Sequence, residues 1–251
     1  MEMVYVPEGS FEMGSTTGYD DEKPVRQVYL DAYWIDKYEV TNRQYRECVA
    51  ADVCDRPRKS ESHTRSDYFY DPEYDDYPVV FVALKDAEAY CGWVGKRVPT
   101  EAEWEKAARG PIDTRIFPWG NEFPDCVRAN FTEDIYDNNL YHCVNDTTKA
   151  GAHPMGASPY GAMDMAGNVW EWTEDWFDPA AQDARVVRSG SFLDKSAWAT
   201  TFHRHRALPV NQYAHTGFRC ALTAAETAAP PVEQLALGQT RAVPLPGSAL
   251  S

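Results

Sequence analysis

The stretch YGAMDMAGNVWEWTEDW, residues 160–176, combines glycine, acidic residues and tryptophan in a pattern that constrains the fold more than any other part of the chain. Its glycines permit backbone conformations that are closed to other residues. Each tryptophan can bury a large apolar area while its indole N–H holds a neighbouring loop in place. We therefore expect the core to contain most of the tryptophans of this stretch and of the preceding FPWGN segment, namely Trp119, Trp170, Trp172 and Trp176.

Around this stretch, the chain has the composition of one large domain. Its 251 residues are 43% hydrophobic, which suffices for a single core, and glycine and proline are scattered rather than clustered. The exception is the segment from Thr223 to Ser251, which is rich in Ala, Pro and Thr and has neither helical nor strand periodicity. The sequence predicts a domain over residues 1–222 and an extended or disordered tail over residues 223–251.

The charge of the chain restricts its partners. A formal net charge of -15 argues against nucleic-acid binding, because contact with a phosphate backbone requires a basic face. An acidic surface suits cations or neutral ligands better. No apolar run approaches the length needed to cross a bilayer, and the first residues already look like part of the domain. We expect no membrane span in this chain, and any signal peptide or anchor is either removed or was never there.

Six cysteines give fifteen possible pairings, so their spacing has to discriminate among them. Cys48 and Cys54 bracket a short turn, and Cys126 and Cys143 bracket a polar loop that is rich in Asn and Asp. Neither pair has the spacing of a zinc site. Disulfides are the natural interpretation, with six buried thiols as the alternative. An even number of cysteines with local spacings favours the periplasm or the cell exterior over the cytosol.

Strand-like patterns are concentrated near the N-terminus. Alternating apolar residues over 3–14 and 26–40 predict strands joined by a charged turn. Residues 55–77 are charged and rich in tyrosine, which indicates a long surface excursion. Residues 112–222 contain only short strand-like runs such as ARVVRSGSF and GFRCAL. A chain of this size with so little regular structure needs further stabilisation, for which disulfides and bound cations are typical.

Three helices have clear signals. Thr41 is a favourable N-cap for a helix over residues 41–50, and a second helix is expected over residues 84–95. The third, over residues 99–110, begins with a capping box formed by Thr100 and Glu103 and ends at a glycine.

Seven motifs occur in order along the chain: GSFEMGS, YWIDKYEVTNRQYRECV, GKRVPTEAEWEKAARG, FPWGN, YGAMDMAGNVWEWTEDW, RVVRSGSF and GFRCA. As a series, they resemble the sulfatase-modifying-factor family, whose founding member is the formylglycine-generating enzyme. The resemblance extends over residues 3–222. It implies an α+β fold that is a variant of the C-type lectin fold with little regular secondary structure.

The resemblance also implies calcium at two places. In the second of these sites, the carboxylates of Asp164 and Glu171 and the carbonyls of Gly167 and Val169 can converge on one hard cation. Asp164 stands where the formylglycine-generating enzyme has an asparagine, so an oxygen ligand is kept and a charge is added.

The first site, by the same resemblance, takes Asn130, the carbonyl of Phe131, Asp146 and the carbonyl of Thr148. Loop lengths around this site differ from those of the enzyme. In both places the alternative is that the acids are solvated loop residues. We expect one or two Ca²⁺ ions and no copper.

Copper is not expected because its ligands are missing. In the formylglycine-generating enzyme, two cysteines bind copper, and thiolates are the soft ligands that hold Cu(I). Alignment at SGSFLDKSAWATTFHRHRA, residues 189–207, puts Asp194 and Ala199 at those two positions. No catalytic residue is therefore assigned.

The resemblance accounts for the remaining cysteines as well. Cys91 and Cys220 match a structural disulfide of the family, and Cys126 and Cys143 pair across their loop. A second family disulfide is absent, because Ala108 occupies one of its positions. No free thiol is expected.

The former substrate groove is expected to survive. The resemblance places Trp170 beside it, and the segment after residue 189 supplies further lining, so the predicted ligand-binding residues are Trp170, Ser191, Asp194, Trp198, His203 and Arg206. The alternative is a metal site at the same groove, built from Asp194, His203 and His205 as a non-haem iron triad. Relatives with such oxygen chemistry usually carry an additional helical metal-binding domain, which is missing here.

Together these features predict a secreted or periplasmic, calcium-stabilised and non-catalytic domain. The expected ligand is a peptide, protein or saccharide held in the former substrate groove. The alternative function is an iron- or other metal-dependent oxidoreductase that uses the same groove.

Overall fold

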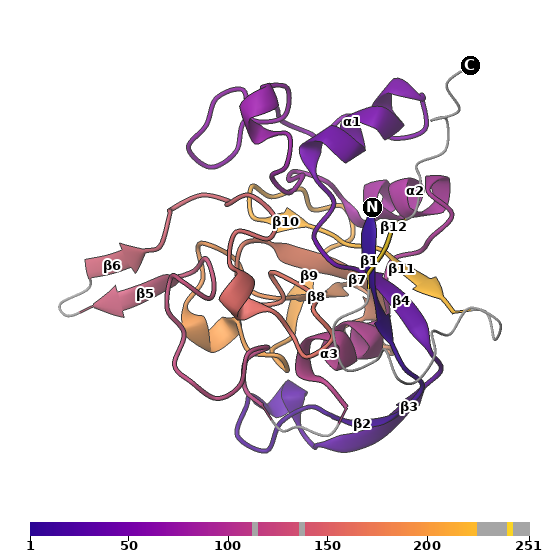
Figure 1. Ribbon diagram of the computed structural model, residues 1–251, viewed down its shortest axis with the longest axis vertical. Helices are drawn as coiled ribbons and strands as arrows, with labels where there is room; N and C mark the ends of the chain where they lie inside the picture. Colours follow the sequence, from indigo (N-terminus) through magenta and orange to yellow (C-terminus); the bar gives the residue numbers. More distant parts are fainter. Residues whose placement is uncertain (112–114, 136–138, 225–239, 243–251) are drawn as a thin grey trace.

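The computed structural model describes residues 1–111, 115–135, 139–224 and 240–242 (Figure 1). Within these residues, three short α-helices accompany strands that form two four-stranded sheets and two hairpins. This is an α+β arrangement, as the sequence predicts. No helix in the described residues is both long and apolar enough to cross a membrane.

The three predicted helices are confirmed, with ends set by the expected caps. They are α1 (Asn42–Ala50), α2 (Leu84–Trp93) and α3 (Glu101–Arg109). The Thr100 side chain accepts a hydrogen bond from the Glu103 N–H at 3.1 Å, and the Glu103 carboxylate accepts one from the Thr100 N–H. Gly110 ends α3 with φ of +92°, a conformation that few other residues adopt.

The N-terminal segments form two strands each rather than one. These are β1 (Glu2–Val6), β2 (Gly9–Met13), β3 (Arg26–Leu30) and β4 (Tyr33–Asp36). β1 pairs with β4, whereas β2 and β3 form a separate hairpin. The break lies at Pro7, which has no N–H to donate to a neighbouring strand. Lys106 of α3 donates to the carbonyls of Pro7 and Gly9 at 2.7 and 2.8 Å, which holds the two parts at this angle.

In the two larger sheets, the spatial order of the strands differs from their order along the chain. The first runs β11-β4-β1-β12 and the second β10-β7-β8-β9. The remaining strands are β5 (Thr132–Ile135), β6 (Asn139–His142), β7 (Trp170–Trp176), β8 (Arg185–Arg188), β9 (His205–Ala207), β10 (Thr216–Gly217), β11 (Ala221–Thr223) and β12 (Thr240–Ala242). The β5–β6 hairpin projects from the body of the molecule (Figure 1). β12 lies in the predicted tail and is extended along β1; residues 225–239 and 243–251 of that tail lie outside the described residues.

The longest strand, β7, lies in the glycine- and tryptophan-rich stretch over residues 160–176. Trp170 and Trp172 are buried, and Trp172 donates its indole N–H to the Val82 carbonyl at 3.1 Å. Trp119 and Trp176 are only half-buried, so the expected core position holds for two of the four tryptophans. Apolar residues of α1 and α2 pack with β7 and β8 in the largest core cluster, and α3 packs with β1 and β4 in the second.

All six cysteines form disulfides, in the pairs Cys48–Cys54, Cys91–Cys220 and Cys126–Cys143. The Cys91–Cys220 bridge links α2 to the segment before β11, 129 residues away in sequence. The disulfide interpretation is therefore confirmed over the alternative of buried thiols.

Candidate functional site

The backbone segments around Asn130 and Gly167 lie side by side, at the place where the residues of both predicted calcium sites meet. Asn130 pairs with Gly167 as an isolated bridge, and the Asn168 N–H donates to the Asn130 carbonyl at 2.8 Å. A Cβ on Gly167 would lie 2.3 Å from that carbonyl oxygen, and Gly167 has φ of +78°. Only glycine satisfies both the close approach and the backbone angle. The crossing places ligands of the first site beside those of the second.

In the second site, the two predicted carboxylates differ in how far they are already bonded. Asp164 is buried with φ of +56°, an unfavourable angle for a non-glycine residue, and its Oδ2 accepts the Gly151 N–H at 2.5 Å. Glu171 is fully buried, and both its oxygens accept from Arg219 at 2.6 Å. Its Oε2 also accepts the Trp104 indole N–H at 2.7 Å. Glu171 is thus saturated by protein donors, and Asp164 is the more available oxygen ligand.

A third acid, Glu39, lies in the same centre and was not predicted from the sequence. Its side chain is buried, Oε1 accepts the Asn168 side-chain amide at 2.8 Å, and Oε2 has no hydrogen-bond partner. Burial raises the pKa of Glu39 well above its ordinary value, and the nearby charges of Asp164 and Glu171 add to this effect. In the sequence, the only signal for Glu39 is its place in the motif YWIDKYEV, between the β4 residues and the buried Val40.

The charges in this centre do not balance. Three acidic groups, Glu39, Asp164 and Glu171, face the single buried guanidinium of Arg219. Burial also raises the pKa of Asp164. Leaving buried carboxylates uncompensated is costly, so either a proton or a further cation has to accompany the pair Glu39 and Asp164. The carboxyl groups of Glu39 and Asp164 lie within hydrogen-bonding reach of each other, so a shared proton is one way to compensate them, and a hard cation that takes oxygen ligands is the other.

The first predicted site also contains an oxygen without a partner. Asn130 is fully buried, and its side-chain amide donates to the Asp146 carbonyl at 2.7 Å while Oδ1 accepts nothing. A buried amide oxygen of this kind fits a calcium ligand. The Phe131 carbonyl accepts the Cys143 N–H at 3.0 Å, and Thr148 lies close by, where its carbonyl accepts a weak bond from Asn168 at 3.4 Å.

Asp146 is engaged mainly with the long loop over residues 55–77. Its Oδ2 accepts from the Ser62 hydroxyl at 2.6 Å and from the hydroxyl and N–H of Thr64 at 2.7 and 2.8 Å. Burial opposes ionisation of Asp146, but these hydrogen bonds outweigh it, so its pKa lies below the ordinary value. Arg65 completes the anchor, since its guanidinium lies 3.5 Å from Asp146 Oδ1 and donates to the Thr147 carbonyl at 3.0 Å.

Asn168 connects the two predicted sites. Its side-chain oxygen accepts the Thr148 N–H at 2.8 Å and the Asn130 amide at 3.3 Å, and its amide nitrogen donates to Glu39. The residue has φ of +62°, so the fold holds it in an unfavourable conformation. The remaining predicted carbonyl ligands, Gly167 and Val169, lie just before β7. The Gly167 carbonyl accepts a hydrogen bond from the Ser189 hydroxyl at 2.9 Å, and Val169 is buried.

At the former copper positions, the two replacements lie in different surroundings. Asp194 is half-buried and accepts a short hydrogen bond from the Ser191 hydroxyl, while its carbonyl accepts the Thr132 N–H at 2.8 Å. Ala199 is buried and packs with Phe131 and neighbouring alanines. Neither side chain is a thiolate, and no cysteine of the chain is free.

Aromatic rings fill the groove next to these positions. Trp170 is 2% exposed, and the rings of Trp198, His203 and His205 lie within 5.3 to 6.4 Å of it, centroid to centroid. Trp198 is half-buried and stacks on both histidines. Trp198 and His205 are thus the more exposed rings of this cluster, whereas Trp170 is covered. Arg206 is also exposed, where it pairs with Asp183 at 2.8 Å.

The histidines serve packing and hydrogen bonding in this arrangement. His203 Nδ1 lies 2.6 Å from the Glu22 carboxylate, and its other ring nitrogen is buried without a partner. Burial lowers the pKa of His205. Nowhere in the described chain do three His, Cys, Asp or Glu side chains converge as metal ligands, which includes the triad Asp194, His203 and His205.

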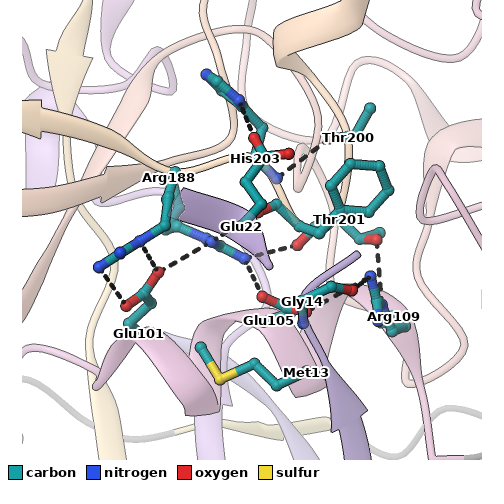
Figure 2. Close-up of polar contacts among 12 residues, drawn as sticks. Met13, Gly14, Glu22, Glu101, Glu105, Arg109, Arg188, Thr200, Thr201 and His203 are labelled. Atoms are coloured by element: carbon teal, nitrogen blue, oxygen red, sulfur yellow. Dashed lines mark hydrogen bonds and ion pairs between the residues drawn. The ribbon is translucent and has the colours of Figure 1, made fainter. Parts of the chain in front are cut away.

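Behind the groove, a buried ion network fixes its rear wall (Figure 2). Arg188 of β8 binds Glu101 and Glu105 of α3 at 3.1 and 2.6 Å and also donates to the carbonyls of Thr201 and Phe202 at 2.7 and 3.2 Å. Figure 2 shows His203 and Glu22 at the edge of this network. The carbonyls of Thr201 and Phe202, just after Ala199, are therefore held by Arg188, which the carboxylates of α3 bind in turn.

Comparison with known proteins gives one consistent result. The sulfatase-modifying factor enzyme 1-like domain matches residues 1–224. The inactive C-alpha-formylglycine-generating enzyme 2 of Mus musculus is 34% identical, over 88% of this chain and 86% of its own length. The formylglycine-generating enzyme of Thermomonospora curvata is also 34% identical, over 87% of this chain and 92% of its own length.

Among solved structures, PvdO from Pseudomonas aeruginosa superimposes with a TM-score of 0.69 at 26% identity, covering 88% of this chain and 94% of PvdO. These likenesses confirm the resemblance predicted from the seven motifs and the C-type-lectin-like α+β fold that it implies. The chain belongs to the sulfatase-modifying-factor family of formylglycine-generating-enzyme-like domains.

Proposed function

We propose that this domain is a calcium-stabilised, non-catalytic member of its family that holds an extended polypeptide segment at the former substrate groove. The observation that carries the non-catalytic part is the pair Asp194 and Ala199, which stand at the copper-cysteine positions while every cysteine is in a disulfide. A carboxylate and a methyl group cannot bind Cu(I) as two thiolates do. The relative named as inactive is consistent with this proposal.

Calcium binding is supported by the unpaired buried oxygens. Glu39 Oε2 and Asn130 Oδ1 have no hydrogen-bond partner, and Glu39 and Asp164 share the one guanidinium of Arg219 with Glu171. Together with the carbonyls of Phe131, Thr148, Gly167 and Val169, they supply the oxygen-rich ligand sets that calcium prefers. When bound, calcium supplies charge compensation and cross-links the segments around Asn130, Glu39 and Asp164. Glu171 holds Arg219 and Trp104 in place around this centre.

A polypeptide ligand is favoured by the sheet that borders the groove. β9 is the edge strand of its sheet, and its residues His205 and Arg206 are exposed beside Trp198. An extended peptide can add to such an edge through main-chain hydrogen bonds while an aromatic side chain supplies a contact face. The rear wall is rigid, so little ordering is required on binding. The three disulfides support an oxidising compartment, and we propose that the domain is secreted or periplasmic.

Elemental analysis and oxygen consumption test the chemical part of the proposal. The purified protein is expected to contain calcium but neither copper nor iron, and to consume no oxygen with a thiol added. Stoichiometric iron together with oxygen uptake, both lost on replacement of His203 or His205, would establish the oxidoreductase instead.

Binding to arrays tests the ligand. The protein is applied in parallel to an array of short random peptides and to a glycan array, with Trp198→Ala and, as a matched control, Trp93→Ala. Peptide binding that Trp198→Ala abolishes and Trp93→Ala retains supports the groove assignment. Binding confined to glycans, or equal loss in both variants, contradicts it.

A further inference from the structure

The Cys126–Cys143 disulfide differs from the other two bridges in its exposure. Every cysteine of the other two bridges is at most 7% exposed, whereas Cys126 and Cys143 are both half-buried. A disulfide opens by exchange only when a thiolate can reach one of its sulfurs, so exposed bridges are the labile ones. Cys126–Cys143 is therefore the bridge of this chain that an external thiol reaches most easily.

The two sulfurs of this bridge lie in different surroundings. Cys143 packs against the apolar cluster that contains Phe131 and Ala199. Cys126 Sγ instead lies 3.3 Å from the hydroxyl of Tyr141, a residue that is 47% exposed. Because a disulfide sulfur carries no proton, the hydroxyl is the donor in this contact. Cys126 is thus the sulfur on the solvent side of the bridge, and Cys143 faces the core.

The bridge adjoins the β5–β6 hairpin, which projects from the body of the molecule (Figure 1). Cys143 directly follows β6, and its N–H donates to the Phe131 carbonyl at 3.0 Å, just before β5. Its neighbour His142 has Nδ1 2.6 Å from the Thr132 hydroxyl oxygen. A cross-link restricts the conformations of the segments that it joins. Opening this one frees the base of the hairpin from the segment that contains Cys126.

The hairpin in turn holds the groove segment over residues 191–198. The N–H and the hydroxyl of Thr132 donate to the carbonyls of Asp194 and Phe192, both at 2.8 Å. The hydroxyl and the N–H of Ser196 both donate to a Glu133 carboxylate oxygen. Motion of the hairpin base is therefore transmitted to the groove segment through four hydrogen bonds.

We propose that Cys126–Cys143 is a reducible bridge that an external protein dithiol opens, and that its opening loosens residues 191–198. A thiolate of the dithiol attacks Cys126 Sγ, the Cys126–Cys143 bond breaks, and Cys143 leaves as a thiolate. The second thiol then attacks the donor's own sulfur in the mixed disulfide, and Cys126 leaves. Two electrons and the two thiol protons pass from the donor to the two cysteines, and the donor is released as a disulfide. Any effect on a groove ligand rests on the proposed function, whereas the opening itself does not.

Partial reduction of the unmodified chain tests the selectivity. The full chain is incubated with dithiothreitol as the dithiol, samples are alkylated at successive times, and peptide mapping by mass spectrometry follows each cysteine. Cys126 and Cys143 are expected to be alkylated about tenfold faster than the four cysteines of the other bridges. Equal rates for all three bridges, or earlier opening of another one, overturn the proposal.

Amide hydrogen exchange over residues 191–198 tests the coupling to the groove. The double variant Cys126→Ser and Cys143→Ser is compared with the oxidised chain, and Cys48→Ser with Cys54→Ser is the matched control. Exchange over this segment is expected to be about threefold faster in the first variant and unchanged in the control. Unchanged exchange in the first variant, or the same rise in both, overturns the coupling.

Should the first variant not fold, as judged by circular dichroism, the same exchange measured on the selectively reduced and alkylated chain makes the same distinction. Neither experiment requires calcium or a peptide. Failure of the proposed function would therefore leave both results unchanged, and failure of the reducible bridge would leave the proposed function intact.

Discussion

At the scale of single residues, the structure separates groups that hold the fold from groups that are available to a ligand. Glu171 and Asp164 look equivalent in the sequence, but Glu171 is occupied by Arg219 and Trp104. Glu39 has the opposite character, because one of its oxygens is buried and unbonded. The sequence predicts Asp164 and Asn130 in two separate sites, and the structure links the two places through Asn168, but spacing cannot show which oxygens protein donors already use.

This difference predicts different effects of removing each acid. Glu171→Gln breaks a buried ion pair and is expected to reduce the free energy of unfolding by about 3 to 5 kcal/mol, whether or not calcium is present. Glu39→Gln is expected to remove mainly the calcium-dependent part of stability. Urea unfolding of both variants, with and without chelator, measures the two effects. Equal sensitivity of both variants to chelator would contradict the assignment.

The burial of Lys106 can be tested through the pH dependence of the free energy of unfolding. Burial lowers the pKa of Lys106 to about 8, whereas an unfolded lysine titrates near 10.4. Between these values the unfolded chain binds more protons than the folded chain, so stability rises with pH over this window; below pH 8 both states are protonated and the contribution is constant. The full shift corresponds to about 3 kcal/mol, which solvent screening reduces, and Lys106→Met is expected to remove this rise. Urea unfolding at several pH values, with Lys59→Met as an exposed control, measures the slope.

At the scale of elements, local signals predicted the helices but not the strands that build the site. Thr41 and Thr100 mark helix starts because capping is a local interaction. β7 is buried on both faces at its start, by Trp170 and Trp172 on one and by the polar Glu171 and Thr173 on the other, so it is not the half-buried strand that alternation marks. The split between β1 and β2 lies at Pro7, which is a local signal, but the angle between the two parts is held by Lys106, 97 residues away from Gly9, and no local pattern contains that contact.

The disulfides differ in how they connect the elements. The Cys91–Cys220 bridge spans 129 residues, and the Cys48–Cys54 bridge spans 6. In the chain-entropy description, the long loop contributes roughly 5 kcal/mol and the short one roughly 2 kcal/mol. Replacing both cysteines of each pair by alanine is therefore expected to lower the melting temperature much more for Cys91 and Cys220. Calorimetry of the two double variants checks this order, and the reverse order would contradict it.

The long loop over residues 55–77 illustrates a tertiary anchor that the sequence did not reveal. Asp146 was predicted as a calcium ligand, and the structure shows it binding Ser62 and Thr64 as well. Asp146→Ala is expected to increase amide hydrogen exchange over residues 59–66 even with calcium in excess, because the anchoring bonds are lost directly. Hydrogen exchange with mass spectrometry, with Asp183→Ala as an exposed control, measures this. Unchanged protection of the loop would show that calcium alone orders it.

At the scale of the whole molecule, the family fold is retained while its oxidative chemistry is not supported by the residues present. Arg188 and the carboxylates of α3 still fix the segment that carries Asp194 and Ala199. Motif order was sufficient to predict this architecture, because seven motifs fix the core, the crossing at Gly167 and the groove together. Trp198 and His203 were predicted near Trp170, but their stacking with His205 into one aromatic cluster could not be predicted, since it depends on side-chain packing across β7, β9 and the preceding loop.

The central claim, that bound calcium stabilises this domain, is tested most directly by the melting temperature of the purified chain with and without a calcium chelator. We predict a lower melting temperature in chelator, which added calcium restores and equimolar magnesium does not, since the ligand set is irregular and rich in oxygen. An identical melting temperature under all three conditions would contradict the account.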